Sequence, residues 1–262
     1  MIGIFDSGVG GMTVARAIEQ LCPGYPLVYF GDIARTPYGS KSRETIISCS
    51  VANAEFLLGQ GAELIVIACN SAASAATDTL RRRFPIPVLE VITPAVDRVV
   101  SVSRSGRVGV IGTRATVASG IYEHRIRQQR PAWQVFSKAC PLLVPLVEER
   151  WLNRRETKMI LRRYLHPLRM RNIDTLVLGC THYPLLSHLI GPRMGRRTRL
   201  IDSSIEVAAG LRRLLAGNPE LRRRLRGRGR ESSFFVSDIT DSVVQLADTI
   251  FGRPIQLEKV HV

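Results

Sequence analysis

Two cysteines, Cys69 and Cys180, stand in similar sequence contexts. Each ends an apolar run ("LIVIAC" at 64–69 and "LVLGC" at 176–180) and precedes polar residues and a helix-forming stretch. A lone buried cysteine is typical of a packed core, whereas two such units in one chain favour a shared function. A helix that begins at each unit would lower the pKa of the thiol and favour the thiolate. The polar residues that follow are Asn70 and Ser71 after the first thiol and Thr181 and His182 after the second.

Paired thiols in one cleft suit proton abstraction and return, acyl transfer, metal binding or disulfide exchange. A metal site is disfavoured, because Cys180 and His182 are only two residues apart and the chain has no C-x-x-C or His-rich motif. Disulfide exchange usually relies on C-x-x-C as well. Beside a thiol, His182 could orient or polarise it. The remaining cysteines are expected to be structural: Cys22, Cys49 and Cys140.

Two further polar turns could contribute to a binding site. "FDSGVGG" (5–11) follows the first expected strand, which places Asp6 and Ser7 where they would face a cleft. Its glycines permit positive φ and close backbone approach, but Thr13 stands where a dinucleotide-binding fingerprint has its final glycine, and the G-K-[ST] of a P-loop is absent. "ARTPYGSKS" (34–42) contains Tyr38 and Gly39, and by itself it indicates no more than a stable turn.

Short apolar strands alternate with helical patterns along the chain, which indicates an α/β fold. Continuous apolar strands such as "LIVIA" and "TLVLG" predict a mainly parallel sheet with helices on both faces. The expected strands are 1–5, 26–30, 63–68, 87–91, 107–111, 132–137, 173–178, 198–201 and 232–236. The expected helices are 11–21, 41–59, 71–83, 94–103, 114–129, 154–169, 183–190, 204–216 and 240–251.

An internal duplication predicts two similar lobes. "IGIFDSGVGGMTVARAI" (2–18) and "VGVIGTRATVASGIYEH" (108–124) each indicate a strand, a polar turn and a helix, and the two cysteine units are separated by a similar length of chain. We expect residues 1–94 with 207–262 to form a first, discontinuous lobe and residues 95–206 a second. Ligands of open α/β sheets bind beyond the carboxyl ends of the strands. The two cysteines should therefore lie on opposite walls of one cleft between the lobes.

The composition narrows the class of protein. The chain has 262 residues and a formal net charge of +15, with its densest cluster at "LRRRLRGRGR" (221–230). Such a charge favours phosphate-rich partners. However, no nucleic-acid-binding module accompanies the arginines. A solvated basic surface is therefore favoured, and nucleic acid is not an expected partner. No apolar run reaches the roughly 18 residues of a membrane span, and Met1 leads into a strand without a signal peptide. We therefore expect a cytoplasmic protein with free thiols.

Taken together, the motifs resemble those of glutamate racemase, in the aspartate/glutamate racemase family. "FDSGVGGMTV", "RTPYG", "ACNSA", "VITPA", "CPLLVPLVEE", "GCTHYPLL" and "IDSS" occur in that family's order and spacing, over about residues 2 to 210. Aspartate racemases share the two-cysteine plan, but "FDSGVGG" with "PYG" and "GCTHYPLL" favours the glutamate enzyme. The resemblance implies two α/β lobes with the active site between them. It also implies interconversion of L- and D-glutamate without pyridoxal phosphate or another cofactor, which supplies D-glutamate for bacterial peptidoglycan.

The resemblance assigns roles to individual residues. Cys69 and Cys180 resemble the two acid–base thiols on opposite faces of the substrate Cα. Asp6 would assist the first thiol and His182 the second, and Glu148 in "PLVEE" matches a further polar residue of the site. No metal is expected, and the expected partner is the small-molecule substrate glutamate. The residues that resemble the family's substrate-binding set are Asp6, Ser7, Tyr38, Gly39, Asn70, Ser71, Thr181 and His182.

The chain departs from the family pattern in a few respects. Ser71 stands where the family usually has threonine, and the arginine-rich segment 221–230 is not part of the family's signature. Because the chain begins at the first strand, the resemblance implies that it lacks the N-terminal extension of members activated by a peptidoglycan precursor. A homodimer is one option for its assembly.

Three other functions remain open at this stage. An aspartate or other amino-acid racemase would share nearly all of the chemistry, and an arginine-rich nucleic-acid-binding protein would use the basic clusters instead. A pyridoxal enzyme would need a Schiff-base lysine, and no lysine of the chain stands in a convincing site.

Overall fold

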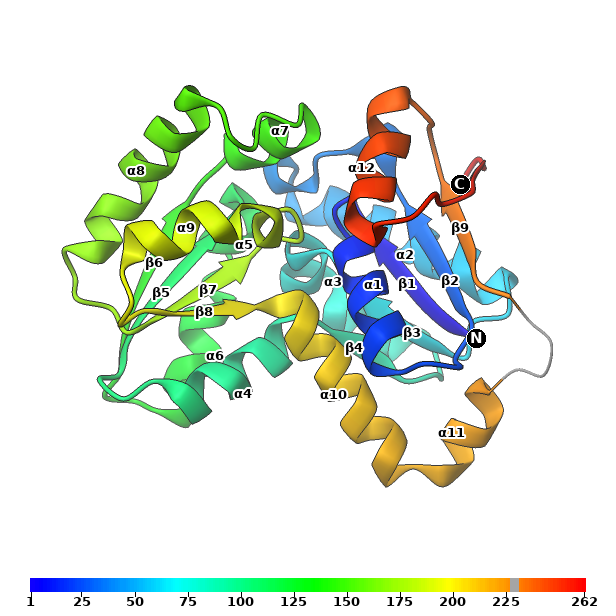
Figure 1. Ribbon diagram of the computed structural model, residues 1–262. Helices are drawn as coiled ribbons and strands as arrows, with labels where there is room; N and C mark the ends of the chain where they lie inside the picture. Colours follow the sequence, from blue (N-terminus) through cyan, green and yellow to red (C-terminus); the bar gives the residue numbers. More distant parts are fainter. Residues whose placement is uncertain (227–230) are drawn as a thin grey trace.

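The computed structural model describes residues 1–226 and 231–262, and the strands within these ranges form two β-sheets covered by helices (Figure 1). The strands are β1 (Ile2–Asp6), β2 (Leu27–Gly31), β3 (Leu64–Ile67), β4 (Val88–Glu90), β5 (Arg107–Gly112), β6 (Gln134–Ala139), β7 (Thr175–Gly179), β8 (Arg199–Asp202), β9 (Ser233–Val236) and β10 (Leu257–Lys259). The α-helices are α1 (Met12–Leu21), α2 (Arg43–Gly59), α3 (Asn70–Arg83), α4 (Ile92–Val102), α5 (Arg114–Ala118), α6 (Ile121–Gln129), α7 (Leu143–Glu148), α8 (Arg155–Arg169), α9 (Ser187–Met194), α10 (Ser203–Gly217), α11 (Pro219–Leu225) and α12 (Asp241–Phe251). Short 3₁₀ turns cover Ile33–Arg35, Tyr38–Ser40 and Tyr183–Leu186.

Both sheets have the same inner strand order. The first runs β10-β9-β2-β1-β3-β4 and the second β6-β5-β7-β8, so the order 2-1-3-4 recurs as 6-5-7-8. Every paired strand in both sheets is parallel. The expected fold class, two similar lobes with mainly parallel sheets flanked by helices, is thus confirmed. The lobe boundaries at residues 94 and 206 stay a prediction.

The central strands are buried from end to end, which explains why their sequences are apolar without alternation. All residues of β1, β2, β3 and β7 are buried, because helices cover both faces of a parallel sheet. Each large apolar side chain removed from water stabilises the fold by roughly 1.5–3 kcal/mol. These rigid strands fix the positions of the residues that follow their carboxyl ends.

The structure departs from the expected elements in several places. The helix expected at 114–129 is divided into α5 and α6, because Gly120 adopts a left-handed conformation with φ of 64°. The segment 183–190 begins as a 3₁₀ turn before α9 continues to Met194. The sequence did not predict α7, which contains Pro145, or the short helix α11. It also missed β10, a largely exposed edge strand of only 3 residues.

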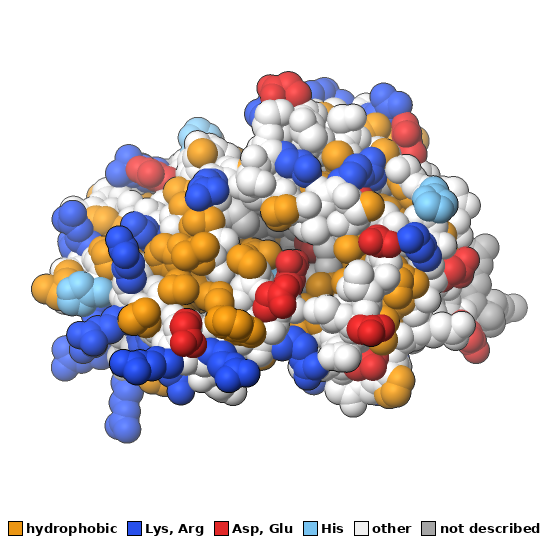
Figure 2. All heavy atoms as spheres, turned by 90° about the horizontal axis from the view of Figure 1, so that it is seen from above, with side chains coloured by type: hydrophobic (Ala, Val, Ile, Leu, Met, Phe, Trp, Pro, Cys, Tyr) orange, Lys and Arg blue, Asp and Glu red, His pale blue; other side chains and the backbone are white. Residues whose placement is uncertain are grey.

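No helix of the described residues is long and apolar enough to cross a membrane. Lysine and arginine side chains gather on the left of the face in Figure 2, over the lobe that carries α8 and α9. The arginine-rich segment lies elsewhere: its first part forms α11, at the lower end of α10 in Figure 1. Residues 227–230 of that segment lie outside the described residues.

Candidate active site

The candidate catalytic residues lie at the carboxyl ends of the central strands of both sheets. Asp6 is the last residue of β1, and Cys69 is the N-cap of α3 directly after β3. In the second sheet Thr113 follows β5 and Cys180 follows β7. Each sheet's chain path reverses direction at these strands, and such switch points are where open α/β sheets bind ligands.

Both thiols line one small cavity between the lobes. Its volume is about 20 Å³, which is room for about one water molecule. Glutamate is much larger than this, so the cavity must widen to admit it. The cavity contains all of the expected substrate ligands except Asp6, which is buried behind it. Its lining residues are Ser7, Thr36, Pro37, Tyr38, Gly39, Cys69, Asn70, Ser71, Thr113, Val144, Cys180, Thr181 and His182.

Cys69 is held as a thiol. Its Sγ donates to Oγ of Ser7 at 3.5 Å and accepts from the backbone N–H of Ala72 at 3.5 Å. Burial, with a smaller effect of the Asp6 charge, raises the pKa of Cys69 to about 12, although these two hydrogen bonds lower it. The expectation that a helix start makes this group a thiolate is therefore wrong for Cys69, because loss of solvation outweighs the helix N-terminus.

Asp6 is placed to exchange a proton near neutral pH. Its side chain is fully buried and accepts from the Gly8 N–H at 3.0 Å and from the Thr181 hydroxyl at 3.3 Å. Burial raises the pKa of Asp6 to about 6, while the charge of His182 and the hydrogen bonds oppose this rise. A carboxyl group with such a pKa suits general acid–base work at neutral pH.

Cys180 has a cationic neighbour instead of a carboxylate. Its Sγ lies 3.8 Å from Nδ1 of His182, whose Nε2 lies 3.0 Å from Oε1 of Glu148. Burial alone would lower the pKa of His182, but its interactions with Cys180 and Glu148 outweigh burial and raise that pKa to about 10. A protonated imidazole ring therefore lies beside the Cys180 sulfur. The two walls of the cavity therefore differ in charge.

Two glycines allow the first polar turn to approach these groups. A Cβ atom on Gly10 would lie 2.5 Å from Nδ1 of His182, and one on Gly11 would lie 2.2 Å from Cβ of Asp6. Neither glycine has a positive φ. Gly10 and Gly11 are thus required for close packing against His182 and Asp6 and not for backbone conformation.

Tyr38 contributes its position and not its hydroxyl group. That hydroxyl donates to the buried carboxylate of Asp32 and accepts from Nδ2 of Asn53 at 3.0 Å. The polar end of Tyr38 is therefore engaged inside the first lobe. The residue lines the cavity together with the adjacent Gly39.

Sequence reasoning missed Thr113. Its Oγ1 lies 2.8 Å from Oγ of Ser71, so it joins the second lobe to the first at the cavity wall. The internal duplication could have pointed to this residue. Thr113 follows β5 in the second sheet, just as Ser7 follows β1 in the first. The serine in place of the family's threonine keeps the hydroxyl that makes this contact.

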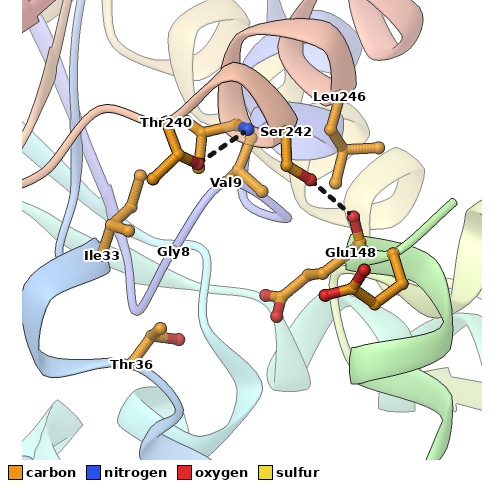
Figure 3. Close-up of a pocket in the computed structure, with 10 residues that line it drawn as sticks. Gly8, Val9, Ile33, Thr36, Glu148, Thr240, Ser242 and Leu246 are labelled. Atoms are coloured by element: carbon orange, nitrogen blue, oxygen red, sulfur yellow. Dashed lines mark hydrogen bonds between the residues drawn. The ribbon is translucent and has the colours of Figure 1, made fainter.

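A larger pocket of about 210 Å³ adjoins the cavity (Figure 3). The two spaces share Thr36, and Glu148 projects from α7 while α12 supplies the opposite wall. The Ser242 hydroxyl donates to the backbone carbonyl of Glu148 at 2.8 Å, which fixes α12 to α7. Sequence reasoning did not foresee this contribution of α12. The lining residues are Gly8, Val9, Ile33, Thr36, Glu148, Glu149, Thr240, Ser242, Val243 and Leu246.

Neither a disulfide nor a cluster of metal-ligating side chains occurs in residues 1–226 and 231–262. The cysteines described there are all buried free thiols. No group of three or more His, Cys, Asp or Glu side chains is arranged to hold a metal ion in this part of the chain.

Comparisons with known proteins agree on one group. The family model described as Asp/Glu/Hydantoin racemase matches residues 2–211. Glutamate racemase of Geobacter metallireducens is 44% identical, over 96% of this chain and 92% of that protein. Among solved structures, a glutamate racemase isoform from Bacillus anthracis superposes with a TM-score of 0.93 at 34% identity, over 100% of this chain and 97% of that one. Glutamate racemase from Francisella tularensis, solved with D-glutamate, gives a TM-score of 0.89 at 35% identity, over 99% and 97%.

Proposed function

The chain belongs to the Asp/Glu/Hydantoin racemase family, and we propose that it interconverts L- and D-glutamate with Cys69 and Cys180 as acid–base thiols and without a cofactor. The family membership confirms the resemblance inferred from the motifs. The similar proteins are glutamate racemases over nearly their whole length, and the family's product serves peptidoglycan synthesis. The observation that carries the two-thiol assignment is that both buried cysteines, one from each lobe, line the same cavity.

The reaction removes the α-proton from one face of glutamate and delivers another proton to the opposite face. In one direction the Cys180 thiolate takes the α-proton and becomes a thiol, while the Cys69 thiol gives its proton to Cα and becomes a thiolate. The reverse reaction exchanges these roles. Asp6 serves as the proton-exchanging partner of Cys69, and the imidazolium of His182 stabilises the thiolate of Cys180. Each turnover in this direction therefore ends with Cys180 as the thiol and Cys69 as the thiolate.

Neutral donors dominate the substrate site. Among the described lining residues His182 is the only one that carries positive charge, and the others supply hydroxyl, amide and backbone N–H groups. Backbone N–H groups at the start of α3 face an anion favourably. We assign these donors to the substrate carboxylates, where the backbone N–H groups also stabilise the charge that builds up on the α-carboxylate in the transition state.

We further propose that the enzyme acts in the cytoplasm, where the peptidoglycan precursors that need D-glutamate are made, and that it forms a homodimer. Leu142 and Trp151 support a self-association surface, because they are 50% and 44% exposed on either side of α7. Light scattering of the purified protein distinguishes a dimer from a monomer. A mass of one chain at micromolar concentration would contradict the dimer.

The direct test of the activity is polarimetry of the purified protein with L-glutamate and no added cofactor. We expect the optical rotation to decay to zero as both enantiomers reach equal concentrations. A parallel sample with L-aspartate should keep its rotation. Racemisation of aspartate at a comparable kcat/KM would contradict glutamate as the preferred substrate.

A further inference from the structure

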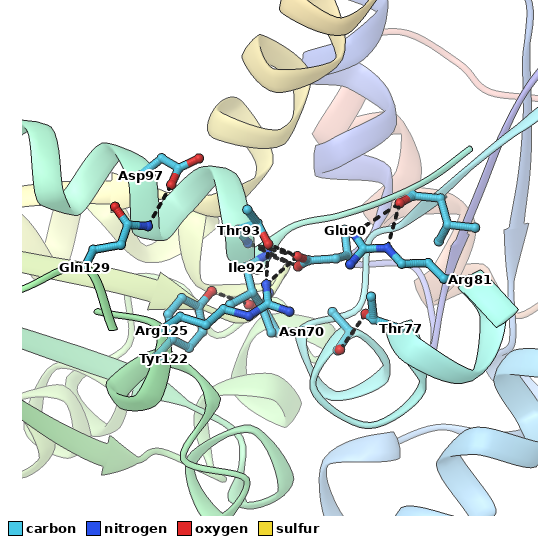
Figure 4. Close-up of polar contacts among 12 residues, drawn as sticks. Asn70, Thr77, Arg81, Glu90, Ile92, Thr93, Asp97, Tyr122, Arg125 and Gln129 are labelled. Carbon is cyan, nitrogen blue, oxygen red and sulfur yellow. Dashed lines mark hydrogen bonds and ion pairs between the residues drawn. The ribbon is translucent and has the colours of Figure 1, made fainter. Parts of the chain in front are cut away.

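Helix α6 belongs to the second lobe, but two of its side chains contact the first (Figure 4). The Tyr122 hydroxyl donates to Oδ1 of Asn70 at 2.7 Å, and Nη1 of Arg125 lies 2.6 Å from Oε1 of Glu90. Tyr122 and Arg125 are three residues apart, so they lie on the same face of the helix. Asn70 is the residue after Cys69, and Glu90 ends β4. One helix face therefore reaches both the active site and the chain segment that leaves the first sheet.

The Glu90–Arg125 contact fixes α6 in place. Glu90 is fully buried on its side chain, and Arg125 is only 20% exposed. The Glu90 carboxylate also accepts the backbone N–H groups of Ile92 at 2.5 Å and Thr93 at 3.1 Å, at the start of α4. A buried carboxylate that lost its cation would be strongly unfavourable. The closed arrangement of α6 against the first lobe is stabilised accordingly.

The contact with Tyr122 determines which way the Asn70 amide points. Oδ1 of Asn70 accepts from Tyr122, and Nδ2 donates to Oγ of Ser203 at 3.4 Å. An amide nitrogen has two hydrogens, so one N–H remains for the cavity that Asn70 lines. Without the tyrosine hydroxyl, Oδ1 loses its donor and only the long 3.4 Å bond from Nδ2 to Ser203 holds the amide, which could then rotate and present its oxygen instead. An oxygen there would repel a carboxylate.

Tyr122 stays a donor throughout the working pH range. Its side chain is 2% exposed, and burial, followed by the charge of Glu90, raises the pKa of this tyrosine well above its ordinary value. The hydroxyl has a single hydrogen, which the contact with Asn70 uses. The Ser203 hydroxyl donates its own hydrogen to the Leu178 carbonyl at 3.2 Å, so it accepts from Nδ2 of Asn70 and leaves Oδ1 to accept from Tyr122.

We propose that Tyr122 is a positioning residue that orients the Asn70 amide with an N–H toward the substrate. Because the two residues belong to different lobes, the amide is held in this orientation only when the lobes are closed. The ion pair of Glu90 and Arg125 holds α6 in the position from which Tyr122 contacts Asn70. This inference rests on the proposed function, since it takes glutamate as the occupant of the cavity.

The test compares Tyr122→Phe with Tyr164→Phe, which removes the hydroxyl of a half-buried tyrosine that does not line the cavity. We expect Tyr122→Phe to raise KM for both glutamate enantiomers roughly tenfold and to leave kcat within about twofold, because the lost contact acts on bound substrate and transition state alike. The dissociation constant of D-glutamate, measured by calorimetry, should rise by the same factor. Tyr164→Phe should match the wild type.

A double-mutant cycle separates positioning from a general structural role. In an Asn70→Ala background, Tyr122→Phe should change KM no further, because the group that it orients is gone. If Tyr122→Phe does not fold, Arg125→Lys takes its place, with a smaller rise in KM and an unchanged kcat.

Unchanged KM and dissociation constant in Tyr122→Phe, or an undiminished effect in the Asn70→Ala background, would overturn the positioning role. An unchanged KM in Arg125→Lys would do the same where that variant is the one measured. These results differ from failure of the proposed function, which would show as a wild-type protein that does not racemise glutamate. D-glutamate binding, measured without turnover, then still decides whether Tyr122 acts on the site.

Discussion

Glu148 and His182 form a pair that spans the edge of the active site, with Oε1 of the carboxylate 3.0 Å from Nε2 of the imidazole. The other ring nitrogen faces the Cys180 thiol at 3.8 Å. Glu148 lines the larger pocket, whereas His182 lines the cavity that contains both thiols. The carboxylate therefore influences the second thiol through the histidine and not by direct contact.

Replacing Glu148 by glutamine should lower the pKa of His182. In the wild type this pKa is raised to about 10, above the unfolded value of about 6.5. The stabilisation from the protonated ring is therefore fully present below pH about 6.5 and is lost as the pH rises toward the folded value. NMR titration of the His182 ring measures this pKa in the wild type and in Glu148→Gln. An identical pKa in Glu148→Gln would contradict the role of the carboxylate.

Gly10→Ala should reduce kcat by about two orders of magnitude, the effect expected when a catalytic group is displaced by roughly 1 Å. The added methyl group would lie 2.5 Å from the His182 ring, so the ring or the turn must move. Gly59→Ala is the matched control, because its Cβ has no neighbour within 4 Å. Steady-state assays of both variants provide the comparison. Wild-type kcat in Gly10→Ala would show that the ring tolerates displacement.

Arg125→Met should lower the free energy of unfolding by about 3–5 kcal/mol, because it leaves the buried Glu90 carboxylate without its cation. The control is Arg83→Met, whose partner Glu55 and own side chain are 49% and 55% exposed. An exposed pair contributes about 1 kcal/mol or less. Urea denaturation of both variants gives the two values. Equal losses of unfolding free energy in the two variants would mean that the buried Glu90 carboxylate does not need Arg125 as its counter-ion.

Glutamine at Arg222, Arg223 and Arg224 should leave kcat/KM within a few-fold of the wild type. These arginines belong to α11, which lies at the lower end of α10 in Figure 1, and none of them lines the cavity. Salt screens the effect of their charges on the cavity, since the Debye length is about 8 Å at physiological ionic strength. A large loss of kcat/KM would place this segment in contact with the catalytic region.

The sequence predicted the sheet strands and the site much better than the contacts between the lobes. Apolar runs such as "LIVIA" give a clear strand signal, and polar residues directly after them mark the carboxyl ends where the cavity forms. In contrast, α7 contains Pro145 and spans only 6 residues, so no helical period reveals it. The contacts of Tyr122 with Asn70 depend on the closure of two lobes, which has no local sequence pattern.

The charge states could not be read from the sequence either. A helix start after Cys69 predicts a lowered pKa, but complete burial and the nearby Asp6 raise it. Burial depends on the packing of both lobes around the cavity. The catalytic roles assigned to the individual residues stay predictions until they are tested.

The most direct test of the two-thiol mechanism is isotope incorporation at Cα during early turnover in D₂O. Exchangeable thiols carry deuterium there, so one of Cys69 and Cys180 should remove protium from Cα while the other delivers deuterium to the opposite face. Mass spectrometry of the separated enantiomers at low conversion should therefore find D-glutamate deuterated at Cα and the remaining L-glutamate largely protiated. Early D-glutamate that retains its protium would contradict two thiols on opposite faces of the substrate.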